Sequence, residues 1–297
     1  MLIRIATRKS NLALVQTNLV IAKIKESFPE AICEIMPMIT TGDRITDKNL
    51  YEIGGKALFL KELEEKLLAN EADIAVHSLK DVPAILPDNL KIAAVLERED
   101  ARDCLVSYKY KSLEELPEKG TIGFSSIRRK VLMKKFKPGM RVVQIRGNID
   151  TRLLKLKEHN APDGMLLACA GLKRIGLFDE SFCTPLSASY FIPAPCQGII
   201  AVEIRSDDSK MADICDKINH LPTWHLAQAE REFLIHFNAS CDTPIGAYAY
   251  YINANNMKID YMYGVPEGRF LRFHVEVGAP DEVKEMAERA VTYLKSY

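Results

Sequence analysis

Apolar and polar residues alternate along the first hundred positions in two patterns. Short runs rich in Ile, Val and Ala predict strands, and longer stretches with an apolar residue every three or four positions predict helices. The predicted strands are residues 2–7, 31–40 and 72–78, and the predicted helices are residues 11–28 and 58–71. Ser10 and Pro29 are good start and stop signals for the first helix. Strands that alternate with helices are typical of an α/β domain with a largely parallel sheet.

The same alternation starts again after a charged run, EREDARD, at residues 97–103. Strand-like TIGF, RVVQI and MLLACA each precede a predicted helix, which indicates a second α/β domain. The Pro- and Gly-containing segment FIPAPCQG leads into one more strand, where we expect the chain to return to the first domain. The remaining helices and strands predict a small α+β domain. We therefore expect three domains, formed by residues 1–97 with 197–214, residues 101–193 and residues 219–297.

Composition and charge narrow the class of protein. The chain has 297 residues, with 40 Lys and Arg against 40 Asp and Glu and 47% hydrophobic residues, which is typical of a globular protein. Zero net charge, and basic segments without interleaved aromatic residues, argue against a single-stranded nucleic-acid binder. The chain shows no signal segment and no apolar run near the roughly 18 residues that cross a bilayer, so we expect a cytoplasmic protein. Seven cysteines without Cys-x-x-Cys pairs argue against a zinc site and a disulfide framework.

Basic residues gather where the predicted strands end. Ligands of open α/β sheets bind beyond the carboxyl ends of the strands, so cations at five such ends predict an anion-binding region. Two arginines even stand in the first turn of a helix, where each cation costs about 0.3–1 kcal/mol. Arginine suits planar carboxylates and no phosphate-binding glycine pattern is present, so a ligand with several carboxylates is favoured over phosphate. Ordinary solvated side chains are the alternative for each of these cations. The cations are Arg8, Lys9, Lys80, Arg128, Arg129, Arg146, Arg152, Lys173 and Arg174.

A few other residues are candidates for chemistry. Asp81 in HSLKDVP directly follows a buried strand and would stay ionised among cations, which suits it to stabilise a developing positive charge. A turn aspartate that caps the next segment fits the spacing equally well. His77, on the apolar strand, is predicted to be a core residue. Cys241 is the one cysteine in a polar loop, where a thiol can react, whereas Cys169 is predicted to be buried.

Taken together, several of these segments resemble one protein family. TRKSNLALVQ, TTGDRITD, GGKALFLKELE, HSLKDVP, EREDARD, FSSIRRK, QIRGNIDTRL, AGLKRIGL and CDTPIGAYA, in this order, closely resemble the porphobilinogen deaminase (hydroxymethylbilane synthase) family. The resemblance runs from the first strand to about Tyr250. It implies an α/β fold of two domains like those of type II periplasmic binding proteins, with a central cleft, plus a small C-terminal α+β domain.

The resemblance also implies a transferase of tetrapyrrole (heme) biosynthesis. Four porphobilinogen molecules are added head to tail, with loss of ammonia, to a dipyrromethane cofactor joined by a thioether to Cys241, and hydroxymethylbilane is released. Every pyrrole ring of that chain carries an acetate and a propionate, which accounts for cations at helix starts. We expect porphobilinogen as the small-molecule substrate, no nucleic acid, membrane or metal partner, a monomer, and hand-over of the product to the next enzyme.

Site residues follow from the resemblance position by position. Asp81 matches the catalytic aspartate, which would stabilise the cation left when ammonia departs. The residues that match a mobile loop over the cleft are Gly54, Gly55 and Lys56. The residues that match the cofactor site are Cys241, Lys80, Ser126, Arg128, Arg129 and Arg146. The residues that match the substrate site are Arg8, Ser10, Arg146, Arg152 and Arg174.

Two segments depart from the family pattern. Ala239 and Ser240 stand where glycines usually precede the cofactor cysteine, and they would be strained if the backbone there has a positive φ. Cys196 in PAPCQG replaces a usual glycine at the returning hinge, and we expect it either to alter hinge motion or to offer a second thiol. Neither departure removes a group that the chemistry needs, so we expect an active enzyme. The alternative is a non-catalytic carboxylate-binding protein on the same scaffold, in which Cys241 no longer accepts the cofactor.

Overall fold

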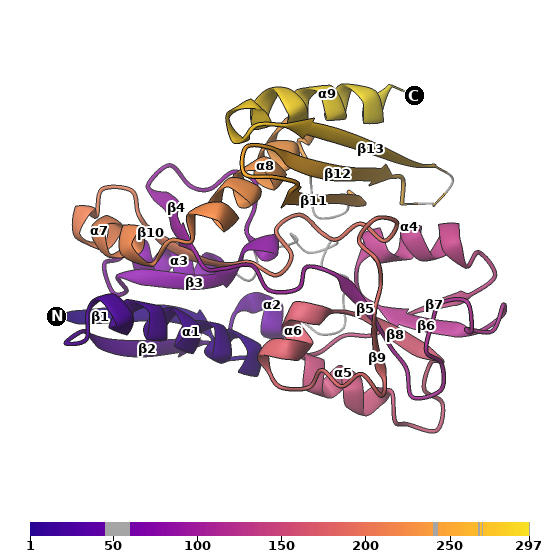
Figure 1. Cartoon of the computed structure of the whole chain (residues 1–297). Helices are drawn as coiled ribbons and strands as arrows, with labels where there is room; N and C mark the ends of the chain where they lie inside the picture. Colours follow the sequence, from indigo (N-terminus) through magenta and orange to yellow (C-terminus); the bar gives the residue numbers. More distant parts are fainter. Residues whose placement is uncertain (45–59, 240–242, 267, 269, 297) are drawn as a thin grey trace. The chain divides into compact units, whose positions relative to one another are not determined.

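The computed structural model describes the chain except for residues 45–59, 240–242, 267, 269 and 297. The described chain divides into two compact units (Figure 1). Unit 1 comprises Met1–Glu99 and Gly198–Ala227, and unit 2 comprises Asp100–Gln197 and Gln228–Tyr297. These boundaries fall in the charged run, in the Pro- and Gly-containing segment, and within a helix. A search of the described residues finds no helix that is long and apolar enough to span a membrane.

Unit 1 contains a five-stranded sheet with helices on both faces. Its strands are β1 (Leu2–Arg8), β2 (Ile32–Met38), β3 (Ile74–Ser78), β4 (Leu90–Val95) and β10 (Ile200–Arg205). Its helices are α1 (Asn11–Ser27), α2 (Thr41–Arg44), α3 (Lys61–Leu68), the 3-10 turn η3 (Leu79–Asp81) and α7 (Ser209–Ile218). The strand order is β2-β1-β3-β10-β4, with β10 antiparallel to both of its neighbours. Helices α1 and α7 share one apolar core with the sheet, and α3 packs in another.

Unit 2 contains a second α/β sheet with the same arrangement. Its strands are β5 (Asp103–Val106), β6 (Thr121–Phe124), β7 (Arg141–Gln144), β8 (Gly164–Ala168) and β9 (Cys183–Pro185). Its helices are α4 (Ile127–Phe136), α5 (Ile149–Lys155) and α6 (Cys169–Arg174). The order is β7-β6-β8-β5-β9, with β7, β6 and β8 parallel and β5 antiparallel to both of its neighbours. In each sheet, therefore, three parallel strands are followed by one strand antiparallel to both of its neighbours (β10 or β5) and then by an edge strand (β4 or β9).

A third, antiparallel sheet of order β11-β12-β13 also belongs to unit 2. Its elements are α8 (Leu221–Phe237), β11 (Ile245–Tyr251), β12 (Met257–Gly264), β13 (Leu271–Gly278), the 3-10 turn η4 (Pro280–Glu282) and α9 (Val283–Lys295), of which α8 begins in unit 1. The ring of Phe233 on α8 lies 4.6 Å from that of Tyr261 on β12. Met262 and Leu271 join the core that contains Leu132 of α4, so this sheet packs against the second α/β sheet.

The fold class predicted from the sequence is confirmed by these elements, namely two α/β sheets of one common design and a small α+β part. The helix predicted at residues 11–28 is observed as α1. Its Ser10 cap is also present, because Ser10 Oγ accepts a hydrogen bond from the backbone N–H of Ala13 at 3.3 Å. Local signals in the sequence were therefore sufficient to place this strand-to-helix unit.

Candidate functional site

In unit 1, two strand ends carry predicted site residues. Strands β1 and β3 are parallel neighbours, so their carboxyl ends lie at the same edge of the sheet. Arg8 ends β1, and Ser10 follows it as the cap of α1. Lys80 and Asp81 follow β3 directly in the turn η3. The structure thus brings Arg8, Ser10, Lys80 and Asp81 to one edge, and all four side chains are partly buried.

The backbone around Asp81 is held in place by buried neighbours. Leu79 is 1% exposed, and its N–H donates to the carbonyl oxygen of Ile199 at 2.9 Å. Gln16 Nε2 of α1 donates to Ser78 Oγ at 2.8 Å, which links the end of β3 to the first helix. Within the part of the chain that the structure describes, the Asp81 carboxylate forms no hydrogen bond or ion pair. Its acceptor capacity is therefore unused by those residues.

His77 is confirmed as a core residue. Its Nε2 lies 2.8 Å from Glu203 Oε2 on β10, and both side chains are buried. The pair also affects Glu64 of α3, because burial and the nearby charge of Glu203 raise the pKa of the Glu64 carboxyl. The imidazole of His77 is thus engaged in a structural pair within the domain.

In unit 2, three adjacent parallel strands carry the remaining described site residues. Strand β6 leads through Ser126 into α4, β7 leads to Arg146, and β8 leads into α6, which ends at Arg174. Ser126 Oγ caps α4 by accepting a backbone N–H of the first turn at 3.5 Å. Arg152 of α5 donates from Nε to the carbonyl oxygen of Gly147 at 2.7 Å. The order β7-β6-β8 places these three ends side by side.

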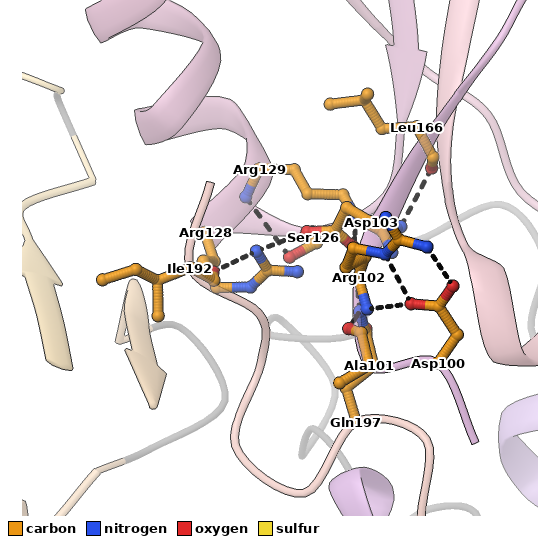
Figure 2. Close-up of polar contacts among 10 residues, drawn as sticks. All are labelled: Asp100, Ala101, Arg102, Asp103, Ser126, Arg128, Arg129, Leu166, Ile192 and Gln197. Carbon is orange, nitrogen blue, oxygen red and sulfur yellow. Dashed lines mark hydrogen bonds and ion pairs between the residues drawn. The ribbon is translucent and has the colours of Figure 1, made fainter. Parts of the chain in front are cut away.

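Arg128 and Arg129 are buried, with exposed fractions of 3% and 6%, and both contact Asp103 at the start of β5 (Figure 2). Arg128 Nη1 donates to Asp103 Oδ2 at 2.6 Å. Arg129 donates to Asp103 Oδ1 from Nε at 3.1 Å and from Nη2 at 2.7 Å. Although burial raises the pKa of Asp103, the two guanidinium charges lower it far below its usual range. The Asp103 carboxylate of the protein itself is therefore the anion that pairs with these two arginines.

Asp103 was not predicted as a site residue, because it lies in the charged run at residues 97–103, after which the second α/β pattern was predicted to start. The signal was an aspartate at the start of a strand in a sheet whose neighbouring helix opens with two arginines. Backbone carbonyl oxygens complete the cluster, since Arg128 also donates to Ile192 at 2.8 Å and Arg129 to Leu166 at 2.9 Å. Two cations against one anion leave one excess positive charge.

Some predicted site residues lie outside the described residues, namely Gly54, Gly55, Lys56 and Cys241. The elements that flank Cys241 are described, because α8 ends at Phe237 and β11 begins at Ile245. Within the described ranges, no group of three or more His, Cys, Asp or Glu side chains is arranged to hold a metal ion. Cys169, predicted to be buried, is 0% exposed.

The two departures from the family pattern have different consequences. Ala239 has no positive φ, so it replaces a usual glycine without backbone strain, while Ser240 lies outside the described residues. Cys196 has a φ of 62°, a left-handed conformation in which glycine is unstrained. Its side chain is 1% exposed, so the thiol is buried.

Comparison with known proteins gives consistent matches over the chain. A family model described as porphobilinogen deaminase, dipyromethane cofactor binding domain, matches residues 3–213, and one described as porphobilinogen deaminase, C-terminal domain, matches residues 224–294. Porphobilinogen deaminase of Rickettsia typhi is 52% identical over 292 residues, covering 98% of this chain and 97% of that protein. The Rickettsia akari protein of that name is 51% identical over 275 residues, covering 93% and 91%. A solved structure of the Bordetella pertussis BvgS periplasmic VFT2 domain is 13% identical, with a TM-score of 0.43, and covers 73% of this chain and 86% of that chain.

Proposed function

This chain belongs to the porphobilinogen deaminase family, and on that basis we propose which of its residues perform each part of the reaction. The protein is a transferase that condenses four porphobilinogen molecules head to tail on a dipyrromethane primer and releases ammonia and hydroxymethylbilane. When bound, the dipyrromethane cofactor supplies the pyrrole to which substrate units are added. The roles below are those of the chain's own side chains.

Binding of the acetate and propionate groups falls to the cations at the strand ends. The observation that supports this role is their placement, since each unit has basic residues at the carboxyl ends of its parallel strands. The cluster at the start of α4 suits a carboxylate because it keeps an excess positive charge and its Arg128 Nε is buried without a partner among the described residues. The proposed cofactor ligands are Lys80, Ser126, Arg128, Arg129 and Arg146, and the proposed substrate ligands are Arg8, Ser10, Arg146, Arg152 and Arg174.

Asp81 is the proposed catalytic residue. Breaking the bond between the aminomethyl carbon and nitrogen releases ammonia and leaves positive charge on the substrate ring. A carboxylate held about 4 Å from that charge stabilises it by roughly 4 kcal/mol at an effective dielectric constant near 20. The fixed turn η3 and the unused acceptor oxygens of Asp81 support this role. A counter-ion is more useful here than an acid, because the substrate amine is already protonated at neutral pH.

Cys241 is the proposed attachment point of the cofactor, through a thioether. Its place in the polar segment between α8 and β11 supports this role, because a loop thiol is accessible to a reactant. Gly54, Gly55 and Lys56 are proposed as the mobile loop that closes over the site during each addition.

The wider organisation is also a proposal. Three domains, formed by residues 1–97 with 197–214, residues 101–193 and residues 219–297, are supported by the three separate sheets and by the break between the two family models. We propose that the protein works as a monomer in the cytoplasm and hands its product to the next enzyme. The six described cysteines form no disulfide with one another, which fits a reducing compartment.

Intact-mass measurement of the purified protein tests the assignment directly. A covalent increment of two porphobilinogen units less two ammonia molecules, located on the peptide that contains Cys241, is the expected result. An unmodified mass that persists after incubation with porphobilinogen would refute it and would leave a carboxylate-binding protein.

A further inference from the structure

The two arginines at the start of α4 contact Asp103 in unequal ways. Within the described residues, every hydrogen bond of the Arg128 side chain comes from Nη1, which donates to Asp103 Oδ2 and to the carbonyl oxygen of Ile192. Arg129 instead places its Nε and Nη2 groups together on Asp103 Oδ1 and points Nη1 at Leu166 (Figure 2). A carboxylate is best bound by two neighbouring N–H groups of one guanidinium. On Arg129 the Nε and Nη2 pair is already used, and on Arg128 no described residue uses it.

Charge and burial show what this cluster still lacks. All three side chains are at least nine-tenths buried, and together they carry two positive charges and one negative charge. Arg128 Nε is a buried donor without a hydrogen-bond partner among the described residues. Such donors are rare because they have lost water without gaining an acceptor. The start of α4 adds a partial positive charge. One further carboxylate at Arg128 would accept a hydrogen bond from its Nε and neutralise the excess positive charge of the cluster.

Asp103 is fixed from both sides, as a support for two arginines must be. Its carbonyl oxygen accepts the N–H of Leu186 at 2.8 Å, and its backbone pairs with β8. Gln197 Nε2 donates to Asp103 Oδ1 at 3.1 Å and to the carbonyl oxygen of Ala101 at 2.7 Å. Gln197 is 1% exposed and is the last residue of the unit 2 segment that begins at Asp100. One amide therefore joins the two ends of that segment to the arginine cluster.

We propose that Asp103 is a positioning residue for cofactor binding. It holds Arg129 and orients Arg128, so that the Nε group of Arg128, which no described residue uses, receives one carboxylate of the bound pyrrole chain. Gln197 keeps the Asp103 carboxylate in the required orientation. The inference rests on the proposed binding role of the arginine pair and adds Asp103 to it as the residue that orients the pair.

The test uses the full chain made without cofactor, with the rate of covalent loading followed by intact mass at increasing porphobilinogen concentrations. Asp103→Asn keeps the side-chain shape, removes the charge and turns one acceptor into a donor that faces a guanidinium. We expect the half-saturating porphobilinogen concentration to rise about tenfold or more, with the limiting rate changed less than about threefold, because one charge-assisted contact is lost. The matched control is Asp73→Asn, which breaks a similar paired contact with Arg4 in unit 1 and should leave loading unchanged.

A double-mutant cycle separates positioning from a general loss of structure. If Asp103 acts through Arg128, then Asp103→Asn has little further effect on the half-saturating concentration in an Arg128→Lys chain. Independent, multiplying effects would overturn the proposal, and so would a half-saturating concentration within twofold of wild type in Asp103→Asn. If Asp103→Asn does not fold, Gln197→Met replaces it, with an expected rise of about threefold, and no rise would again overturn the proposal. Failure of the wild-type chain to load would instead refute the proposed function.

Discussion

Glu230 offers a sharp test of the structure because its buried carboxylate joins three segments of unit 2. It lies on α8 and is 0% exposed. One oxygen accepts the backbone N–H of Ala249 on β11 at 2.7 Å, and the other accepts the N–H of Cys196. Glu230→Gln keeps the size of the side chain but replaces one acceptor oxygen with an NH2 group. One of the two buried amides then loses its acceptor and faces another donor.

The expected cost of Glu230→Gln follows from these two bonds. A hydrogen bond to a charged group contributes about 1.5–3 kcal/mol, and a buried amide left without a partner costs about 1–3 kcal/mol. Because these two costs partly describe the same lost contact, we expect the free energy of unfolding to fall by about 2–4 kcal/mol, a large part of the roughly 5–15 kcal/mol by which a native protein is stable. With about 2–4 °C lost per kcal/mol, the midpoint of thermal unfolding should fall by roughly 4–16 °C.

Urea unfolding, together with hydrogen exchange of the peptides that contain Cys196 and Ala249, measures this effect. The control is Glu232→Gln on the same helix, because Glu232 is partly exposed and pairs only loosely with His236, at 3.4 Å. It should change the free energy of unfolding by less than about 0.5 kcal/mol. The reasoning is refuted if Glu230→Gln is as stable as that control, or if exchange of both peptides is unchanged.

Three further predictions concern the reaction and its pH range. Asp81→Asn should fold normally and slow ammonia release by about a hundredfold or more, measured as ammonia formed per porphobilinogen consumed; a rate within a few-fold of wild type would remove Asp81 from the mechanism. The exposed Asp88→Asn, also in unit 1, is its control. Cys241→Ser should nearly abolish covalent loading in an intact-mass assay, and normal loading would place the attachment elsewhere. Although burial raises the pKa of Asp100, hydrogen bonds from Arg102 and Lys173 lower it from 3.8 to about 2. A carboxyl with a lowered folded-state pKa adds stability above its unfolded pKa, so the stability difference between wild type and Asp100→Asn should be complete above about pH 5 and lost as the pH falls toward 2. A difference that does not vary with pH would contradict this.

Local features of the fold could be predicted from the sequence because they depend on neighbouring residues. Hydrophobic spacing was enough to place α1 and α4 behind their strands, and the predicted cap Ser10 marked the start of α1. The place and direction of the antiparallel strands β5 and β10 within their sheets were not predictable in this way. Each of them pairs with strands far away in the chain, and no short-range pattern specifies such partners.

The candidate site, too, could be predicted from the sequence only in part. The rule that ligands gather at the carboxyl ends of parallel strands correctly brought Arg8 and Asp81 to one edge. The same rule predicted that Arg128 and Arg129 bind an anion from a ligand. Their first partner is Asp103, 25 and 26 residues away in the chain, and only the sheet order β6-β8-β5 brings it near. Charge at a helix start shows that an anion is needed, but it does not show where that anion comes from.

The antiparallel strand of each sheet also affects the order in which the chain can fold as it is synthesised. All five strands of the second α/β sheet lie between residues 103 and 185, whereas the first sheet needs β10 (Ile200–Arg205) to join β3 to β4. A growing chain therefore carries every strand of the later sheet before it carries the strand that completes the earlier one. N-terminal domains usually finish folding first, but here β3 keeps an uncovered edge until residue 205 has left the ribosome. Of the two α/β sheets, the one whose first strands are synthesised earlier is therefore the one that is completed later.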